Sequence, residues 1–239
     1  MLSVEKISKS FRGLKAVASA SFEVPQGGLV ALIGPNGAGK TTCFNMIAGV
    51  FSPDEGSIAF EGKKINGLRA DQICAAGIGR TFQIVKPFAG LSVLDNVMVG
   101  AFLREQTVAA ARLFAISILE KLKLETKASL PASSLTLPDR KRLEVARALA
   151  TRPRLLLLDE VMAGLRPTEC DQMVEVFRDI NRADGLTILL IEHVMRAVMA
   201  LARHIGVLHH GEVIARGAPA EVVRDPAVLE CYLGEETEV

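Results

Sequence analysis

Short apolar runs along the chain predict a set of strands. Runs rich in Val, Ile, Leu and Phe open the sequence, and the turn signal Gly27-Gly28 lies between two of them. Two later runs, LLLLDE and LTILLIE, are apolar almost throughout, which is typical of strands buried on both faces of a parallel sheet. The expected strands cover residues 2–7, 16–24, 29–33, 155–160 and 186–192.

Helical spacing dominates the middle of the chain. Leu, Val and Ala recur three and four residues apart through residues 90–150, which predicts a mostly helical block. Further helices are expected at residues 40–49, 168–183 and 194–203. Glycine and turn residues predict hairpins around Gly62 and at His210-Gly211.

The order of these elements predicts the fold class. Helices that alternate with buried strands are typical of an α/β protein, and the helical block reads as a subdomain inserted into it. The expected organisation is a single domain over residues 1–239. Its core and β part would lie at about 1–83 and 151–239, and its helical part at about 84–150.

Composition limits the classes of function. The net charge is +1 with acids and bases interleaved, which argues against a broad nucleic-acid-binding face. The four cysteines are far apart and form no CxxC pair, so ordinary reduced thiols are expected. The first residues do not resemble a signal peptide, and no apolar run reaches the roughly 18–20 residues needed to cross a bilayer. A soluble, cytoplasmic protein is therefore expected.

The segment GPNGAGKTT matches the phosphate-binding pattern G-x-x-x-x-G-K-[ST]. It follows an expected strand and opens an expected helix, so its backbone N–H groups can curl around phosphates at a helix N-terminus. Lys40 would reach the β- and γ-phosphates, and Thr41 would place its hydroxyl on Mg²⁺. The expected nucleotide-binding residues of this loop are Gly34, Pro35, Asn36, Gly37, Ala38, Gly39, Lys40, Thr41 and Thr42.

Polar residues follow the other buried strands. Asp159 ends LLLLDE and would hold Mg²⁺, while Glu160 could accept a proton from the attacking water or orient it. Taken alone, such an acid pair is commonly a solvated strand end, and the P-loop is what favours a catalytic interpretation. His193 follows the next buried strand, and ligands in such sheets bind outside the carboxyl ends of strands. Gln83, after GIGRTF, carries a weaker signal of its own.

Together these motifs resemble the nucleotide-binding subunits of ABC transporters. The ordered set is the P-loop, Gln83, a helix start near residue 135, LLLLDE, AGLRPTE and His193, and the likeness covers essentially the whole chain. Within that family the chain most resembles the ATPase subunits of branched-chain amino-acid importers. The segments that carry this are FRGLKAV, GIGRTFQ, LSVLDNVMVGA, AGLRPTE, IEHVM and the tail GEVIARGAPAEVVRDPAVLECYLGEE.

The resemblance implies a fold and roles for individual residues. The fold would be a P-loop NTPase (RecA-like) core with an N-terminal antiparallel β subdomain and an inserted α-helical subdomain, and the ligands would be ATP and Mg²⁺. Phe11 would stack on adenine, Gln83 would sense Mg²⁺ and the attacking water, and His193 would contact the γ-phosphate. The loop at 164–166 would meet an opposite subunit, although the family typically places Asn where this chain has Arg166.

The resemblance also implies partners. Two ATPase subunits would form a head-to-tail dimer, homo- or heteromeric, in which one supplies the P-loop and the other the start of its signature helix. Integral membrane permeases would hold the protein at the inner face of the cell membrane, and a solute-binding protein would act through them. The permeases would dock between Gln83 and about Leu130. Phe88, Leu91 and Val93 are candidates for exposed contacts there, with core packing as the alternative.

The signature itself departs from the family pattern. Where the family reads like L-S-G-G-Q, this chain has LTLPD, so Thr136 keeps a hydroxyl for nucleotide while Pro138 removes a backbone N–H. Thr136 is expected to cap a helix, with Pro138 in its first turn. Asp139 is expected to bond back to the N–H of the cap, with its charge partly offset by Arg140, Lys141 and Arg142.

Two interpretations of this variant remain open. In one, it works as an adapted signature and both sites of the dimer hydrolyse ATP. In the other, the chain pairs with a different ATPase subunit, and the site that uses this chain's signature is slower. Losing one hydrogen bond to a charged phosphate would cost about 1.5–3 kcal/mol, which weakens a site without abolishing it.

Other functions compete with branched-chain amino-acid import. The nearest are import of another amino acid or amide and export of lipid. A non-transport ABC protein that acts on nucleic acid or ribosomes usually carries a long coiled-coil insertion or two cassettes, and this sequence has neither. A regulatory cassette that binds ATP without hydrolysing it is disfavoured because Glu160 and His193 are both present.

Overall fold

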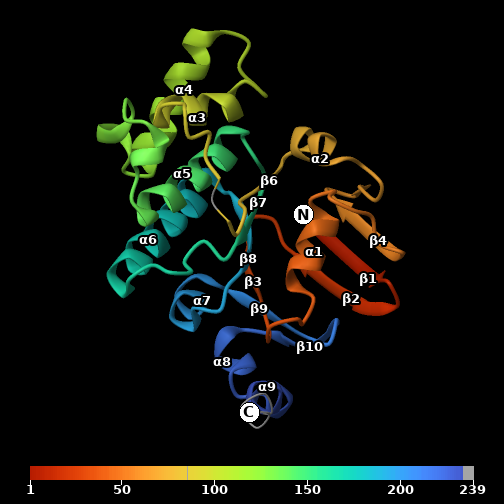
Figure 1. Ribbon diagram of the computed structural model, residues 1–239. Coiled ribbons are helices and arrows are strands. Elements are labelled where there is room, and N and C mark those ends of the chain that lie inside the picture. Colours follow the sequence, from red (N-terminus) through yellow and green to blue (C-terminus); the bar gives the residue numbers. More distant parts are fainter. Residues whose placement is uncertain (85, 234–239) are drawn as a thin grey trace.

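The computed structural model describes residues 1–84 and 86–233, which form two sheets with helices around them (Figure 1). The smaller sheet is antiparallel, in the order β2 (Leu14–Val24), β1 (Leu2–Phe11), β4 (Glu55–Phe60) and β5 (Lys63–Lys64). The larger sheet has the order β10 (Glu212–Gly217), β9 (His204–His209), β3 (Leu29–Ile33), β8 (Thr187–Ile191), β7 (Leu155–Asp159) and β6 (Ile78–Arg80). Its strands pair in parallel from β9 to β6, and β10 pairs antiparallel with β9.

Seven helices lie between strands in the described chain, and two follow the last strand. They are α1 (Lys40–Ile47), α2 (Ala70–Ala76), α3 (Val93–Ala101), α4 (Val108–Lys121), α5 (Leu137–Ala150), α6 (Pro167–Asp184), α7 (Met195–Leu201), α8 (Pro219–Val222) and α9 (Pro226–Leu233). Two short 3₁₀ turns precede α5, η1 (Glu125–Lys127) and η2 (Ala132–Ser134). The prediction of an α/β protein with an antiparallel sheet and a helical block is confirmed, because α3, α4 and α5 fill the middle of the chain. The domain boundaries stay a prediction.

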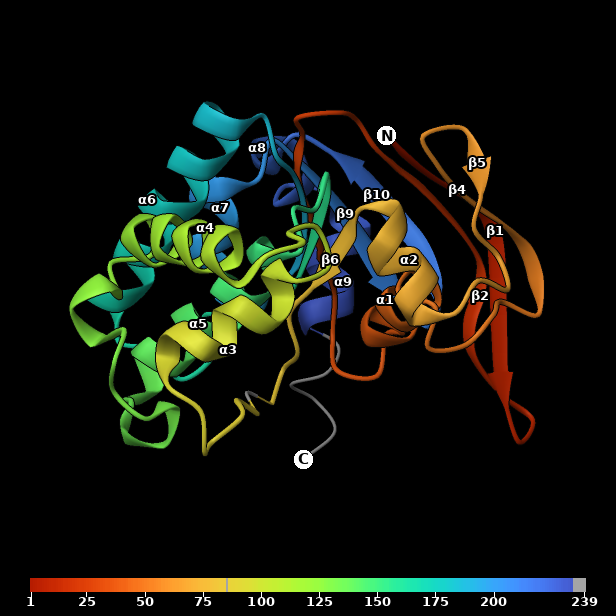
Figure 2. The same cartoon turned by 90° about the horizontal axis from the view of Figure 1, so that it is seen from above.

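The central strands are apolar at every position because alternate side chains enter two different apolar clusters. In β7, Leu156 and Leu158 belong to one apolar cluster, which the helices from α3 to α7 complete. Leu155 and Leu157 belong to a second cluster, shared with α1 and the antiparallel sheet. Figure 2 shows the parallel strands between these two layers, with α3–α6 on one side and β1, β2 and β4 on the other. Each strand therefore buries both faces, as an internal parallel strand must.

Some expectations from the sequence change in the structure. Phe88 and Leu91 are 44 % and 38 % exposed, as expected of a docking surface, but Val93 is 0 % exposed. The prediction for Val93 was wrong because Ser92 caps α3 and Val93 begins the helix on its core-facing side. The end of the quoted tail, 234–236, and the remaining residues to 239 lie outside the described part of the chain. Within residues 1–84 and 86–233, no helix combines the length and apolar character needed to cross a membrane.

The close contact between α3 and α5 yields a stability prediction. A Cβ added at Gly100 would lie 2.6 Å from the carbonyl oxygen of Arg147, which is backbone and yields little. Gly100→Ala should therefore lower the free energy of unfolding by about 1–3 kcal/mol, although alanine favours helix, and chemical denaturation would measure it. Gly90→Ala is the matched control, since a Cβ there meets nothing within 4 Å. Equal stability of the two variants would contradict the close packing.

Candidate active site

The P-loop takes its shape from glycines at the end of β3. Gly34, Gly37 and Gly39 have φ values of 144°, 78° and 101°, a region that disfavours residues with a side chain. A Cβ on Gly34 would lie 2.0 Å from the carbonyl oxygen of Leu208, and one on Gly39 would lie 2.4 Å from that of Ala16. At Gly34 and Gly39 the chain thus approaches neighbouring backbone too closely for any residue other than glycine. Gly37 has open space instead, since a Cβ there meets nothing within 4 Å.

Lys40 lies inside the curl that these glycines make. Its ammonium group donates to the carbonyl oxygens of Gly34 and Pro35, each at 2.7 Å, and the residue is 7 % exposed. Because Lys40 also begins α1, its charge adds to the positive end of that helix. This is an environment suited to the phosphate chain of a nucleotide.

A cavity of about 270 Å³ opens on the P-loop and gathers most of the predicted residues. Gln83 and Glu160, which are far from the loop in sequence, line it as well. The adjoining cavity contains Thr41, Gln83 and Asp159. The first cavity is lined by Ala16, Asn36, Gly37, Ala38, Gly39, Lys40, Thr41, Thr42, Gln83 and Glu160. The structure therefore brings together the residues expected to bind phosphate and those expected to handle water.

Glu160 is the meeting point of the predicted catalytic groups. The side-chain amide of Gln83 donates to its Oε2 at 2.6 Å, and Nδ1 of His193 lies 3.5 Å from its Oε1. The backbone N–H of Glu160 donates to the carbonyl oxygen of Ile191 at 3.0 Å, which fixes the residue to the end of β8. A carboxylate held in this way beside a phosphate loop can orient a water molecule and accept its proton.

Asp159 is buried beside an arginine that the sequence analysis did not single out. Its Oδ2 accepts a hydrogen bond at 3.0 Å from Arg80, whose other terminal nitrogen donates to Asn45 at 2.6 Å. Burial raises the pKa of Asp159, and the hydrogen bond from Arg80 counters that rise. The signal was present in GIGRTFQ, since Arg80 ends β6 three residues before Gln83, but its pairing with Asp159 spans 79 positions.

The donor set fits a magnesium ion. Asp159 Oδ1 is buried and has no hydrogen-bond partner among the described residues, and the residue lines the same cavity as Thr41. A carboxylate and a hydroxyl supply the hard oxygen ligands that Mg²⁺ prefers, with phosphates and water completing its octahedron. Within residues 1–84 and 86–233, no group of three or more His, Cys, Asp or Glu side chains could hold a metal ion by itself.

Phe11 and Thr136 lie apart from this cluster. Phe11, at the end of β1, is 43 % exposed and meets Phe51 edge-on with ring centroids 5.3 Å apart. It is not among the side chains that line the P-loop cavity, and neither is Thr136. The adenine contact of Phe11 and the nucleotide contact of Thr136 therefore stay predictions.

The variant signature turn begins α5 as expected, but with different bonds. Thr136 is the N-cap residue and Pro138 lies in the first turn. The prediction that Asp139 bonds to the backbone N–H of the cap was wrong, because its Oδ2 accepts the hydroxyl of Thr136 at 2.8 Å and the ammonium of Lys127. Burial opposes ionisation of Asp139, yet these two hydrogen bonds and the nearby Arg142 hold its pKa below the usual range. Lys127 in η1, rather than the run after Asp139, makes the ion pair.

Two further buried charges lie next to Glu160, and the sequence did not indicate either. Lys141 in α5 is 5 % exposed and donates to the carbonyl oxygen of Glu160 at 3.0 Å. Glu192, 1 % exposed, accepts the backbone N–H of Met162 at 2.8 Å. Burial raises the pKa of Glu192 to about 7. The sequence offers one signal for Glu192, which is that it directly precedes His193.

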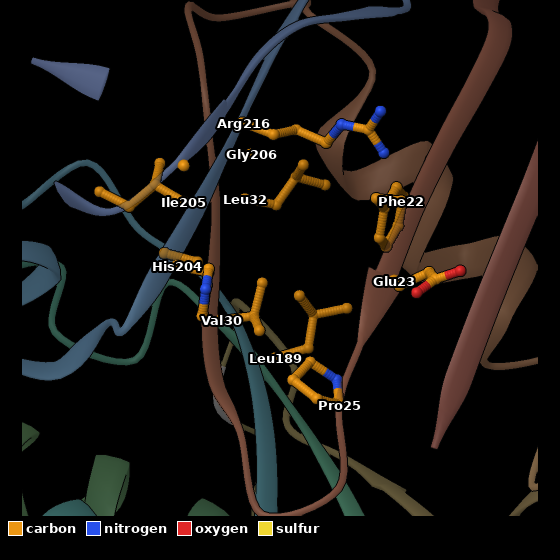
Figure 3. A pocket seen from close by; sticks show the side chains of 12 residues that line it. Phe22, Glu23, Pro25, Val30, Leu32, Leu189, His204, Ile205, Gly206 and Arg216 are labelled. Carbon is orange, nitrogen blue, oxygen red and sulfur yellow. The ribbon is translucent and has the colours of Figure 1, made fainter. Parts of the chain in front are cut away.

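A larger cavity, about 420 Å³, lies between β2 and the parallel sheet (Figure 3). Phe22, Val30, Leu32 and Leu189 point into it, while Arg216 extends across its upper side. Val30 and His204 are paired near the starts of β3 and β9, so the cavity lies toward the opposite end of the sheet from the P-loop. Its walls are mostly apolar, although Glu23, His204 and Arg216 also line it, and none of its lining residues belongs to the P-loop. The P-loop cavity is therefore the better candidate for a nucleotide site.

The fold and the site define an ATP-binding cassette, and the sequence bears this out. A family model described as ABC transporter matches residues 17–163. This is more than half of the chain, so the chain belongs to the ABC transporter family. A second model, described as branched-chain amino acid ATP-binding cassette transporter, matches residues 212–238.

Known relatives match over nearly the full length. The chain is 38 % identical to the high-affinity branched-chain amino acid transport ATP-binding protein LivG of Salmonella typhimurium, over 98 % of each chain. It is 36 % identical to the corresponding protein BraF of Pseudomonas aeruginosa, again over 98 % of each chain. A crystal structure of an ATP-binding cassette of an ABC transporter in its ADP conformation superposes with a TM-score of 0.89, at 32 % identity and 98 % coverage of both chains. The resemblance and the P-loop fold inferred from the motifs are confirmed.

The buried carboxyl of Glu192 gives a pH prediction. Its folded pKa of about 7 exceeds the unfolded value near 4.3, so the folded protein holds a proton that the unfolded chain loses between these pH values. The stabilising contribution is therefore complete below about pH 4 and is lost as the pH rises through 7. Glu192→Gln should remove up to about 4 kcal/mol of the decline in unfolding free energy toward pH 8, measured by denaturation across pH. Glu55→Gln, at an exposed position, is the control, and an unchanged decline in Glu192→Gln would refute the assignment.

Proposed function

We propose that this chain is the ATP-binding and ATP-hydrolysing subunit of an ABC importer for branched-chain amino acids. The observation that carries the hydrolytic part is the arrangement of Glu160, bonded to Gln83 and near His193, on the cavity that the P-loop also lines. A protein that only bound nucleotide would need the loop but not a carboxylate held toward the same cavity.

Each residue has a role in this proposal. The backbone N–H groups of residues 34–39 and the ammonium of Lys40 bind the phosphates, and the N-terminus of α1 adds its partial positive charge. Thr41 and Asp159, with Gln83 nearby, would hold Mg²⁺, which would supply positive charge beside the phosphates. Glu160 accepts the proton of the attacking water, Gln83 holds that carboxylate in place, and His193 contacts the γ-phosphate.

The solute is inferred from the relatives. LivG and BraF serve branched-chain amino acids, and the C-terminal family model is that of the same group of cassettes. Import of another amino acid or amide, or export of lipid, is the alternative, because the solute contacts other subunits. A net charge of +1 gives no support to a nucleic-acid function.

The membrane partners would bind the helical block. Exposed apolar side chains follow the loop after Gln83 and continue along α3 and α4, which is the kind of patch that marks a protein interface. Among them are Phe88, Leu91, Val99, Phe102, Leu103, Val108 and Leu113. Permease subunits seated there would hold the protein at the inner face of the cell membrane, where ATP is supplied.

The signature turn supports pairing with a second, different ATPase subunit. The Thr136 hydroxyl donates its proton to Asp139, and Pro138 has no N–H, so this turn has fewer donors to offer a phosphate. A partner with more donors at this position would complete the site built on this chain's P-loop. The site that uses this chain's own signature turn would be the slower of the two.

Two substitutions separate binding from hydrolysis. Lys40→Ala should weaken ATP binding because the phosphates lose their buried cation. Glu160→Gln should keep ATP binding but lower turnover by about 10²-fold or more, because the amide accepts no proton. Binding would be followed with a fluorescent ATP analogue and turnover by phosphate release.

With the permease subunits in vesicles, wild-type protein should drive uptake of leucine in preference to glutamine.

Asp225→Asn is the control for these variants, since Asp225 lies at the start of α9 away from the P-loop cavity. Unchanged ATP affinity and turnover in Lys40→Ala would overturn the proposed active site. Normal ATP turnover with uptake of a different solute would leave the ATPase intact and refute only the branched-chain assignment.

The pairing proposal predicts a gain of activity. Pro138→Gly together with Asp139→Gln should raise ATP turnover of the assembled pair severalfold, because a hydrogen bond to phosphate is worth about 1.5–3 kcal/mol. Steady-state phosphate release by the purified pair would measure it. No gain would count against a slow second site, and full activity of this chain as a homodimer would refute the need for a different partner.

A further inference from the structure

Glu160 has a backbone conformation that its neighbours must hold. Its φ of 50° lies in the left-handed region, which costs a residue with a side chain about 1–3 kcal/mol. The carboxylate direction depends on this backbone, since a return to the ordinary region would rotate the side chain away from Gln83. Both backbone groups of Glu160 are bonded. Its N–H donates to the carbonyl oxygen of Ile191, and its carbonyl oxygen accepts from Lys141 at 3.0 Å and from the backbone N–H of Ala163 at 3.3 Å.

Lys141 reaches Glu160 from a different layer. It lies in α5, one turn after the helix begins at Thr136, and its ammonium group is 3.0 Å from the carbonyl oxygen of Glu160. Burial lowers the pKa of Lys141, while the carboxylates of Glu192, Glu160, Asp159 and Glu144 act in the opposite direction. A buried cation among four acids, 5 % exposed, is expensive to keep unless its hydrogen bonds are needed.

Glu192 holds the loop that follows Glu160. Glu192 directly follows β8 and accepts the N–H of Met162, two residues after Glu160, at 2.8 Å. Its second carboxylate oxygen is buried without a hydrogen-bond partner in the described part of the chain. Lys141 and Glu192 thus fix residues 160–162 between the signature helix and the strand that leads to His193.

We propose that Lys141 is a positioning residue for Glu160, and that it transmits movement of the signature turn to the catalytic base. The proposal rests on the proposed function, in which the start of α5 meets nucleotide bound by an opposite subunit. A shift of α5 by a fraction of an ångström would lengthen the bond from Lys141 to the Glu160 carbonyl. The base at one ATP site would then respond to occupancy of the other.

The location of Lys141 makes its effect specific to turnover. Its ammonium group donates to the carbonyl oxygen of Glu160, and it is not among the side chains that line the P-loop cavity. ATP binding depends on Lys40 and the loop backbone, which α5 does not supply. Loss of Lys141 should therefore lower kcat and leave the KM for ATP and the affinity for ADP nearly unchanged.

The experiment compares Lys141→Met with Lys141→Arg in the complex with its partner subunits. Lys141→Met should lower kcat by about tenfold or more, and Lys141→Arg should recover much of it because arginine also donates to a carbonyl oxygen. KM for ATP and the affinity for a fluorescent ADP analogue should stay within about twofold of wild type. Lys121→Met, which removes an exposed lysine from α4, is the charge-matched control.

A double variant tests whether the loss of kcat in Lys141→Met comes only from leaving Glu192 without its cation. Lys141→Met leaves Glu192 buried without its cation, so Lys141→Met with Glu192→Gln removes that acid and preserves the fold if the single variant loses it. A kcat that stays low in the double variant supports the role of the bond to Glu160. Recovery of kcat in the double variant, wild-type kcat in Lys141→Met, or parallel losses in kcat and ADP affinity would overturn it. If wild-type complex fails to hydrolyse ATP, the proposed function fails instead.

Discussion

The parallel register of β3, β8 and β7 determines where the chemistry of this protein lies. Leu32 and Asp159 both pair with Ile191, so the three strands end at one edge of the sheet. The P-loop starts directly after β3, and Glu160 is tied by its N–H to that same Ile191. A slip of one residue in β7 would exchange its two buried faces and carry Asp159 away from Thr41.

Charges from distant parts of the chain orient the acids at this edge. Arg80 from β6 holds Asp159, Lys141 from α5 holds the backbone of Glu160, and Lys127 from η1 holds Asp139. A buried ion pair such as that of Arg80 and Asp159 adds little net stability, since desolvation offsets much of its attraction. These contacts do restrict each carboxylate to one direction, which apolar packing alone would leave loose. The site is therefore a network whose members come from several elements.

Sequence patterns revealed those features that depend on neighbours in the chain. The P-loop and the strand before it lie within a few residues of each other, so their spacing predicted them. The acid pair Asp159–Glu160 was interpreted as catalytic only because the P-loop was present. The partners of those acids could not be found in the same way, because Arg80 and Asp159 are 79 positions apart and meet only after β6 and β7 pair. The burial of Val93 could not be predicted from the sequence either, because it depends on the direction in which α3 starts after its cap Ser92.

The six-stranded sheet also separates two apolar clusters that share no side chain. One cluster carries α1 and the antiparallel sheet beneath the P-loop, and the other carries the helices from α3 to α7. The two layers meet through polar contacts such as that from Lys141 to Glu160, whereas their apolar packing is separate. Substitutions in the apolar packing of the helical layer can therefore reshape its exposed side while the packing behind the P-loop stays the same.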